Sequence, residues 1–321
     1  MSKTFQACTA AAILVCVLGV QVRAESNDRS TESDMADPRE ACADLPSYQT
    51  VLAALKSANS EPGGLNLAGS GQRNNMWATV VNRDGVVCGV VTTGTDRGDQ
   101  WPGGRLISAQ RANTANAFSL PKFAFSTANL YAAVQPGGAM FGIEQSNPVA
   151  PGVAYRGDPA RYGTSDDPMI GRRVGGINVT GGGVALYESA GLKRLVGAIG
   201  VSGDTACRDH RVAWVMRTAL RLDGVPAGVN SGNPTTAPLP DNIVYDMGAG
   251  TPVPSTEGSR PLSASGFGHP LCSIDELVLA GNLPAAPASV TSAGAGSAVP
   301  AASTPSTVAA VAAAASAVAS K

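Results

Sequence analysis

The feature that most constrains the fold of this chain is a set of short apolar segments separated by tight turns. Residues 76–82 (MWATVVN) and 85–94 (GVVCGVVTTG) flank an Asn-Arg-Asp-Gly turn, and residues 177–179, 183–189 and 194–201 follow at similarly short spacing. Parallel strands need crossover connections of about a dozen residues or more, whereas antiparallel strands can be joined by a hairpin. The spacing therefore predicts a mainly antiparallel sheet.

Helical patterns occupy other parts of the chain. Residues 47–58, 105–118 and 126–134 have the apolar spacing and the residue types of helices. The small residues of 105–118 permit close packing of a helix on a sheet. We therefore expect the α/β (α+β) class, with an antiparallel sheet flanked by helices.

A further helix is expected after the turn at residues 202–204, with Asp204 or Ser202 as its candidate N-cap. One apolar stripe recurs along it, formed by Val212, Val215, Met216, Ala219 and Leu220. At about 100° per residue, the opposite side of the helix carries His210, Trp214, Arg217 and Arg221. This pattern indicates that His210 is not a core residue of the helix.

The two ends of the chain lack the pattern of a globular domain. Residues 1–24 combine a lysine near the start, an apolar run and a final Val-Arg-Ala, which is typical of a signal peptide. Residues 25–40 have the composition of a linker, and the Ala/Pro/Ser-rich residues 279–321 predict a disordered tail. We expect an exported protein, periplasmic or secreted, with no membrane span, because a bilayer requires an apolar run of about 20 residues.

Charge and cysteine content limit the partners and the kinds of site that we expect. The chain has 23 Lys and Arg residues against 24 Asp and Glu residues and no basic run, so nucleic acid is not an expected partner. Cleavage of the signal peptide would leave Cys42, Cys88, Cys207 and Cys272, which favour disulfides in an exported chain and allow three connectivities. No CxxC pair is present, so a closed zinc site is not expected.

Five blocks of the chain occur in a recognisable order: RDGVVCGVV, SAQRANTANAFS, LYAAVQPGGAMFGIE, GGINVTGGGVALY and LVGAIGVSGDTACRDHRVAW. In this order they resemble the GlcG-like haem-binding (haem-degrading) family. The likeness is to its exported, longer members, which also carry a Pro/Asp-rich insertion, here at about 145–173, and an ending of the type SASGFGHPLC. It covers roughly Cys42 to Cys272, within a domain that we place at residues 41–278.

The resemblance implies a three-layer, profilin-like fold that assembles into a homo-oligomer. It also implies binding of haem or a related tetrapyrrole, with haem or iron handling, or redox sensing, as the function. Two other classes stay open: a haem-degrading enzyme or other oxidoreductase, and a non-catalytic surface or structural protein with the same fold. We assign no catalytic residue, because GVSGD lacks the G-x-S-x-G spacing and His210 lies too far from Ser202 for a hydrolase.

Two histidines are the leading candidates for a haem site. His210 could be an axial ligand of the iron, Trp214 could stack on the macrocycle, and Arg217 and Arg221 could pair with propionates. If Cys207 pairs with Cys272, His210 and His269 each lie three residues from that bridge, and both imidazoles could reach one iron. Cys42 and Cys88 would then form the second disulfide.

Each of these assignments has a plainer alternative. The helix face that carries His210 could be an ordinary solvent-facing side. The bridge could serve only to fasten the C-terminal arm to the core, with both histidines as bystanders. Cys88 could be a small buried apolar residue on a strand.

Weaker candidates also have two interpretations. The glycine turns at 181–183 and 202–204 could present backbone N–H groups to an anion, or could only allow tight turns. Met140 and Tyr131 could be iron ligands or core residues. The run TSDDPM at 164–169 could hold a hard cation or could be ordinary loop chemistry.

Overall fold

The computed structural model describes residues 37–65, 73–230, 239–248, 263–273, 275–281 and 283. The expected signal peptide, most of the expected linker and nearly all of the expected tail lie outside these residues and stay predictions. Within the described part, no helix is long and apolar enough to cross a membrane.

The core of the fold is a sheet of four strands, β1 (Trp77–Asn82), β2 (Val87–Thr92), β3 (Gly183–Tyr187) and β4 (Leu195–Ser202). Their order is β2-β1-β4-β3, and each neighbouring pair is antiparallel, as predicted. The β1–β2 turn is held by the side chain of Asn82, whose Oδ1 accepts from the backbone N–H groups of Asp84 and Val86, both at 2.9 Å.

Residues 177–179, which the sequence predicts as a strand, lie outside the sheet. The backbone N–H of Asn178 donates to Thr114 Oγ1 at 2.9 Å, and that of Val179 donates to Glu144 Oε1 at 3.3 Å. Side chains therefore satisfy the backbone groups that a neighbouring strand would otherwise bond.

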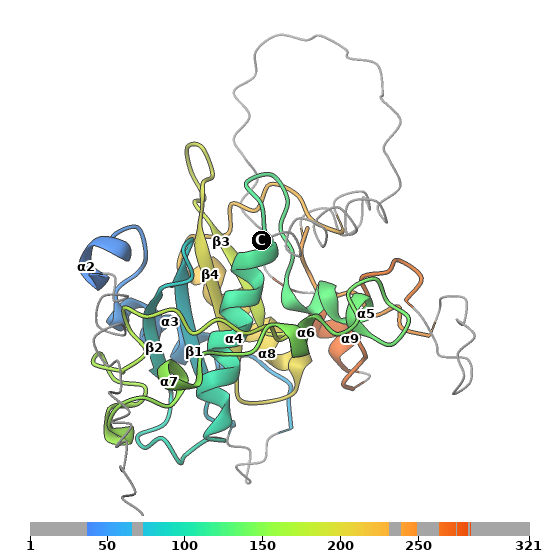
Figure 1. Cartoon of the computed structure of the whole chain (residues 1–321). Helices are drawn as coiled ribbons and strands as arrows, with labels where there is room; N and C mark the ends of the chain where they lie inside the picture. Colours follow the sequence, from blue (N-terminus) through green and yellow to red (C-terminus); the bar gives the residue numbers. More distant parts are fainter. Residues whose placement is uncertain are drawn as a thin grey trace, which may run out of the picture. The chain divides into compact units, whose positions relative to one another are not determined.

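Helices cover both faces of the sheet and make three layers (Figure 1). On one face, α3 (Tyr48–Ala58) and α8 (Ala206–Ala219) pack with Ala78 and Val80 of β1. On the other face, α4 (Gly103–Phe118) packs with Trp77 and Val81. This alternation along β1 is the two-residue period of a strand buried on both sides. The expected three-layer arrangement is thus present.

The helices differ from the sequence pattern in detail. Residues 126–134 form a 3-10 helix, η1 (Thr127–Leu130), that continues into the short α5 (Tyr131–Val134). The N-cap of α8 is Thr205, whose Oγ1 accepts from Arg208 N, and not Asp204 or Ser202. The carboxylate of Asp204 is engaged elsewhere, because it accepts from Asn74 Nδ2 and from Leu65 N.

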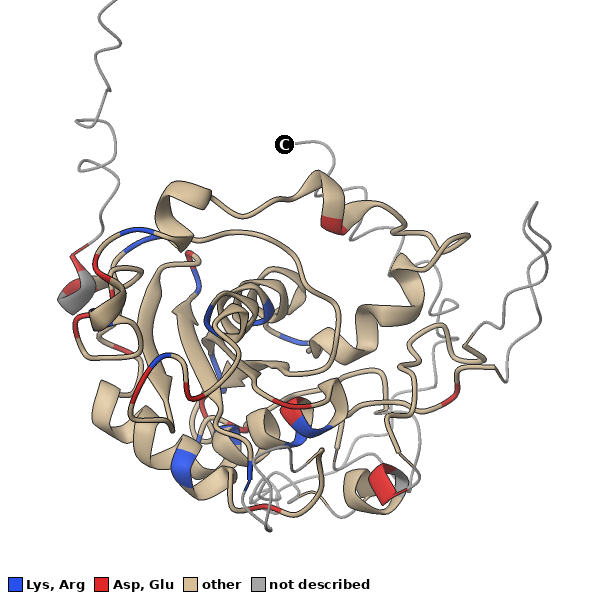
Figure 2. Cartoon of the chain, turned by 90° about the horizontal axis from the view of Figure 1, so that it is seen from below, with Lys and Arg blue, Asp and Glu red and all other residues tan. Residues whose placement is uncertain are grey.

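The remaining elements are short: α2 (Pro38–Ala41), α6 (Ile143–Ser146), α7 (Pro151–Ala154), η2 (Pro159–Arg161) and α9 (Asp275–Gly281). α6, α7 and η2 belong to the segment leading into and through the expected insertion. α9 runs past residue 278, where we expected the domain to end. Figure 2 shows basic and acidic residues interspersed over the described chain.

Two disulfides join distant parts of this fold, in the pairing that we favoured. Cys42, next to α2, is bonded to Cys88 of β2, with 5.6 Å between Cα atoms. Cys207, in the first turn of α8, is bonded to Cys272 of the C-terminal arm, with 6.1 Å between Cα atoms. The second bridge fastens the arm to the core.

Candidate ligand site at the start of helix α4

The loop between β2 and α4, residues 93–102, borders three hollows of the described surface. The first has a volume of about 310 Å³ and the second, on the side of Tyr48 and Tyr162, about 230 Å³. The third and largest has a volume of about 550 Å³ and shares Gly98 and Pro102 with the first. The loop is therefore a common wall of these hollows.

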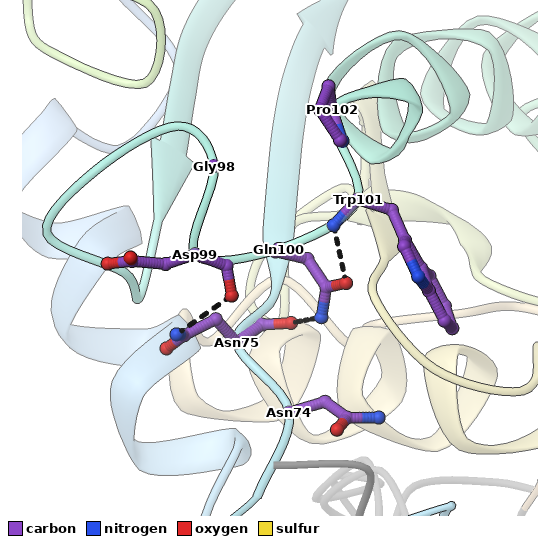
Figure 3. A pocket seen from close by; sticks show the side chains of 7 residues that line it. All are labelled: Asn74, Asn75, Gly98, Asp99, Gln100, Trp101 and Pro102. Carbon is purple, nitrogen blue, oxygen red and sulfur yellow. Dashed lines mark hydrogen bonds between the residues drawn. The ribbon is translucent and has the colours of Figure 1, made fainter.

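Hydrogen bonds hold this loop in place. The carboxylate of Asp99 accepts from Thr95 N at 2.7 Å and from Asp96 N at 2.9 Å, and these bonds lower the pKa of Asp99. The side chain of Gln100 donates to the backbone oxygen of Asn75 (Figure 3). It also donates to Gly203 O at 2.8 Å, so the loop is fastened to the residues next to β1 and β4.

The first hollow is smaller than the third, and amide side chains are among its walls. Figure 3 shows its amide side chains, Asn74, Asn75 and Gln100, with Trp101 at one side. Each amide is already bonded, since Asn75 Nδ2 donates to Asp99 O at 3.3 Å and Asn74 Nδ2 to Asp204 Oδ2 at 2.7 Å. Trp101 is 48% exposed. The hollow suits a small polar group beside an aromatic ring.

The third hollow is larger and mainly apolar. Its walls include Trp77, Pro102, Leu106, Ala154, Tyr155, Pro159 and Tyr162, with Arg97 at an exposed position. Tyr155 is 69% exposed. Ligand pockets are usually apolar hollows of roughly 300 to 1,000 Å³ with a few placed polar groups. The dimensions and lining of this hollow are those of a small-molecule site.

The insertion forms the outer wall of this hollow because a buried ion pair fastens it to α4. Arg105 donates to Asp167 through Nε at 2.9 Å and Nη2 at 2.5 Å, and through Nη1 to Ala154 O at 2.7 Å. Its guanidinium also lies 3.7 Å from the ring centre of Tyr162. All of these interactions hold the wall, so Arg105 is a positioning residue.

The same ion pair shows the role of Asp167 in the TSDDPM run. Asp167 is committed to Arg105 and accepts from Gly163 N and Met169 N, so the loop interpretation holds. Among the described residues, no group of three or more His, Cys, Asp or Glu side chains could hold a metal ion.

The expectation that His210 lies away from the core is wrong, because its side chain is 0% exposed. Residues 239–248 cover that face of α8: His210 Nε2 lies 3.2 Å from Asn242 Oδ1 and accepts from Ile243 N at 3.2 Å. Burial lowers the pKa of His210 to about 3. The imidazole is therefore neutral at physiological pH.

His269 is also buried and neutral. Its Nε2 accepts from Gly181 N at 3.2 Å, its Nδ1 is 2.7 Å from Pro270 O, and burial lowers its pKa to about 4. The structure brings His269 and His210 to either side of Gly181, whose N–H donates to His269 and at which a Cβ would lie 3.2 Å from His210 Cβ. Coordination of a haem iron by either histidine would require displacement of the segment that covers it.

The other predicted partners separate into two groups. Trp214 and Arg217 are buried beside His210, with the Arg217 guanidinium 4.2 Å from the ring centre of Trp214 and bonded to Asp241 at 2.6 and 2.8 Å. Arg221 lies beyond the end of α8, is exposed and has a left-handed backbone. Only Arg221 of this set faces solvent.

The weaker candidates have structural roles. Met140 packs in an apolar cluster with Phe125 and Phe267, and the ring centre of Tyr131 lies 5.1 Å from that of His269. A Cβ at Gly181 would lie 2.5 Å from Ala206 O, so close backbone packing requires glycine there.

Sequence reasoning missed the third hollow. Its walls come from β1, the start of α4 and the insertion, which are far apart in the chain. Two sequence features could have pointed to this hollow. One is the Pro/Gly/Asp-rich insertion, and the other is an arginine in the first turn of a helix that is otherwise rich in small residues.

The fold is that of a three-layer α/β protein with an open, mainly apolar hollow at the start of α4. Residues 68–216 match the model of the family described as haem degrading protein, HbpS-like. These residues are therefore similar to this family, in agreement with the sequence resemblance.

Two solved structures are similar to parts of the chain. One is protein ORFY of Klebsiella pneumoniae, of family DUF336, at 19% identity and a TM-score of 0.35, covering 54% of this chain and 86% of that one. The other is a complex of PduOC with haem, at 17% identity and a TM-score of 0.37, covering 55% of this chain and 94% of that one. No curated protein matches the chain.

Proposed function

We propose that this protein binds haem or a related tetrapyrrole outside the cytoplasm and acts there in haem or iron handling or in redox sensing. The observation that carries the proposal is the third hollow, whose volume of about 550 Å³ and apolar, aromatic walls suit one flat, hydrophobic ligand. The family match at residues 68–216 supports the same ligand class.

The lining residues fit a tetrapyrrole in three respects. Tyr162 offers an aromatic face for stacking on a macrocycle. Arg97, whose nearest acidic partner is the exposed Asp96 at 3.5 Å, offers a charge for a carboxylate. A tyrosine phenol is one of the side chains that hold haem iron in proteins, so Tyr155 is the proposed iron ligand.

The placement outside the cytoplasm is supported by the signal-peptide pattern of residues 1–24 and by the two disulfides. Disulfides persist in oxidising compartments and are rare in the cytosol. A homo-oligomer, which the resemblance implies, is part of the same proposal.

A hemin titration tests the proposal. Purified protein lacking residues 1–24 is mixed with hemin, and the Soret band is recorded for the native chain, Tyr155→Ala, Arg97→Ala and Leu192→Ala. We expect saturable binding by the native chain, weakened about tenfold or more in the first two variants and unchanged in Leu192→Ala, whose side chain is exposed between β3 and β4.

Two results would contradict the proposal in different ways. The absence of a saturable Soret change with the native chain would remove haem binding. A Soret spectrum that changes in His210→Gln or His269→Gln but not in Tyr155→Ala would place the iron at the histidines and not in the hollow.

Breakdown of haem is a second candidate, because the family description names it. An enzyme of this kind would destroy the porphyrin absorption when a reductant and oxygen are supplied. A binding protein would retain the absorption under the same conditions, within the rate seen for hemin alone.

A further inference from the structure

The floor of the third hollow contains the first turn of α4, a helix of 16 residues. Its N-cap, Pro102, has no side chain that can accept from the backbone N–H groups of that turn, and of these groups Gly104 N donates to the backbone oxygen of Trp101 at 2.8 Å. The N-terminus of a helix carries partial positive charge and unsatisfied N–H groups, which attract anions. This end of α4 therefore lacks a side-chain cap.

A second, independent feature lies at the same place. The indole of Trp77 is 1% exposed, and its Nε1 has no hydrogen-bond partner in the described structure. An indole N–H can only donate, and a buried donor without an acceptor is unfavourable. The site thus has an unused indole donor and a helix end without a side-chain cap.

The surroundings of Gly104 show that the indole of Trp77 lies next to the amino end of α4. A Cβ at Gly104 would lie 2.8 Å from Trp77 Cδ1, 3.6 Å from Trp77 Nε1 and 3.5 Å from Ser202 Oγ. The pyrrole edge of the indole and the Ser202 hydroxyl therefore both face the first turn of α4. The benzene edge of Trp77 lies at the other end, against Gly163 of the insertion.

We propose that Trp77, Ser202 and the first turn of α4 form a subsite for a carboxylate of the ligand. The carboxylate accepts from Trp77 Nε1 and the Ser202 hydroxyl and lies on the amino end of α4. The rest of the ligand then occupies the apolar part of the hollow, beside Leu106 and Tyr155.

This proposal rests on the proposed function and makes it more specific, since it requires a tetrapyrrole with a free acid side chain. Arg105 does not supply the positive charge of the subsite, because Asp167 already neutralises it. The helix end and the neutral donors therefore recognise one acid of the ligand, and Arg97 is available for another. A ligand whose acids are esterified should therefore bind less well.

The test compares hemin with hemin dimethyl ester on the native chain and on three variants. Gly104→Ala places a methyl group against Trp77, and Trp77→Phe removes the donor while keeping an aromatic ring. Gly103→Ala is the matched control, because a Cβ at Gly103 would meet nothing within 4 Å. Circular dichroism and the thermal midpoint of each variant show whether it folds.

We expect the native chain and Gly103→Ala to prefer hemin over its ester by about tenfold or more. In Gly104→Ala and Trp77→Phe the preference should fall several-fold, and the preference that remains is the contribution of Arg97. If Trp77→Phe does not fold, the result with Gly104→Ala alone tests the carboxylate subsite.

Contrary outcomes separate the two proposals. Equal binding of hemin and ester by the native chain, or an undiminished preference in Gly104→Ala, would overturn the carboxylate subsite and leave haem binding standing. Failure of the native chain to bind either porphyrin would overturn both.

Discussion

At the scale of single residues, buried charges in this protein are held by partners from distant segments. Arg217 of α8 is buried and bonded to Asp241, which is also buried. Arg111 of α4 is bonded in the same way to Asp209 of α8, at 2.6 Å. A buried charge that loses its partner is costly, so each pair depends on both members.

Replacement of Arg217 by alanine tests this dependence. The change would leave the Asp241 carboxylate buried without its ion-pair partner, and we expect a loss of about 3 to 5 kcal/mol in the free energy of unfolding. Arg221→Ala is the control, because Arg221 is exposed and should change stability by less than about 0.5 kcal/mol. Urea unfolding of both variants checks this, and equal losses would contradict it.

His269 predicts a pH dependence of stability. Burial lowers its pKa to about 4, whereas an unfolded chain protonates histidine near pH 6.5. As the pH falls from about 6.5 to 4, the unfolded state binds a proton that the folded state does not, so stability falls. The contribution is about 1.4 kcal/mol per pH unit.

The variant His269→Gln isolates this contribution, since the other titrating groups are common to both chains. Unfolding free energies are measured between pH 7 and 4. We expect the native chain to lose stability more steeply than the variant over this range. Parallel curves would show that His269 is protonated equally in both states.

At the scale of elements, the C-terminal arm decides the environment of α8. Residues 239–248 and 263–273 bring Asn242, Ile243 and His269 against elements of the core. The bridge Cys207–Cys272 ties this arm to the first turn of α8. α8 is thus buried on the side where its sequence shows a polar face.

Removal of this bridge should loosen the arm. In the double variant Cys207→Ala, Cys272→Ala, we expect a loss of about 2 to 4 kcal/mol, because the bridge closes a loop with a sequence separation of 65. The amide of His269, bonded to Val244 O at 2.7 Å, should exchange with solvent faster.

The second bridge provides the control for this prediction. The double variant Cys42→Ala, Cys88→Ala removes a disulfide that is attached to β2. In this variant, exchange of the His269 amide should not become faster than the loss of overall stability accounts for. Equal acceleration in both variants would show that the arm does not open on its own.

At the scale of the whole molecule, the sequence pattern of residues 1–24 predicts a processed, exported protein. The small residue at Ala24 places the cleavage after it, so the mature chain should begin at Glu25. Expression with the native start in a bacterial host, followed by N-terminal sequencing of the exported protein, checks this. An intact Met1 in the cytoplasm would contradict it.

Local sequence patterns predicted much of the fold but less of the site. The hairpin of β1 and β2 and the helix α3 depend on turn residues and apolar spacing within a few positions, which can be recognised in one segment. The environment of His210 could not be predicted this way. The apolar stripe of α8 indicates one buried face, but the arm buries the other through Asn242 and Asp241.

By itself, the sequence determined the antiparallel sheet and the flanking helices and carried the family resemblance, because these depend on local periodicity and on ordered motifs. Only the tertiary structure decided that the predicted histidines are enclosed and that the open hollow lies at the start of α4. The physical reason is that both results come from contacts between distant residues. Arg105 and Asp167 close the wall of the hollow, and Arg217 and Asp241 help to close the interior around His210.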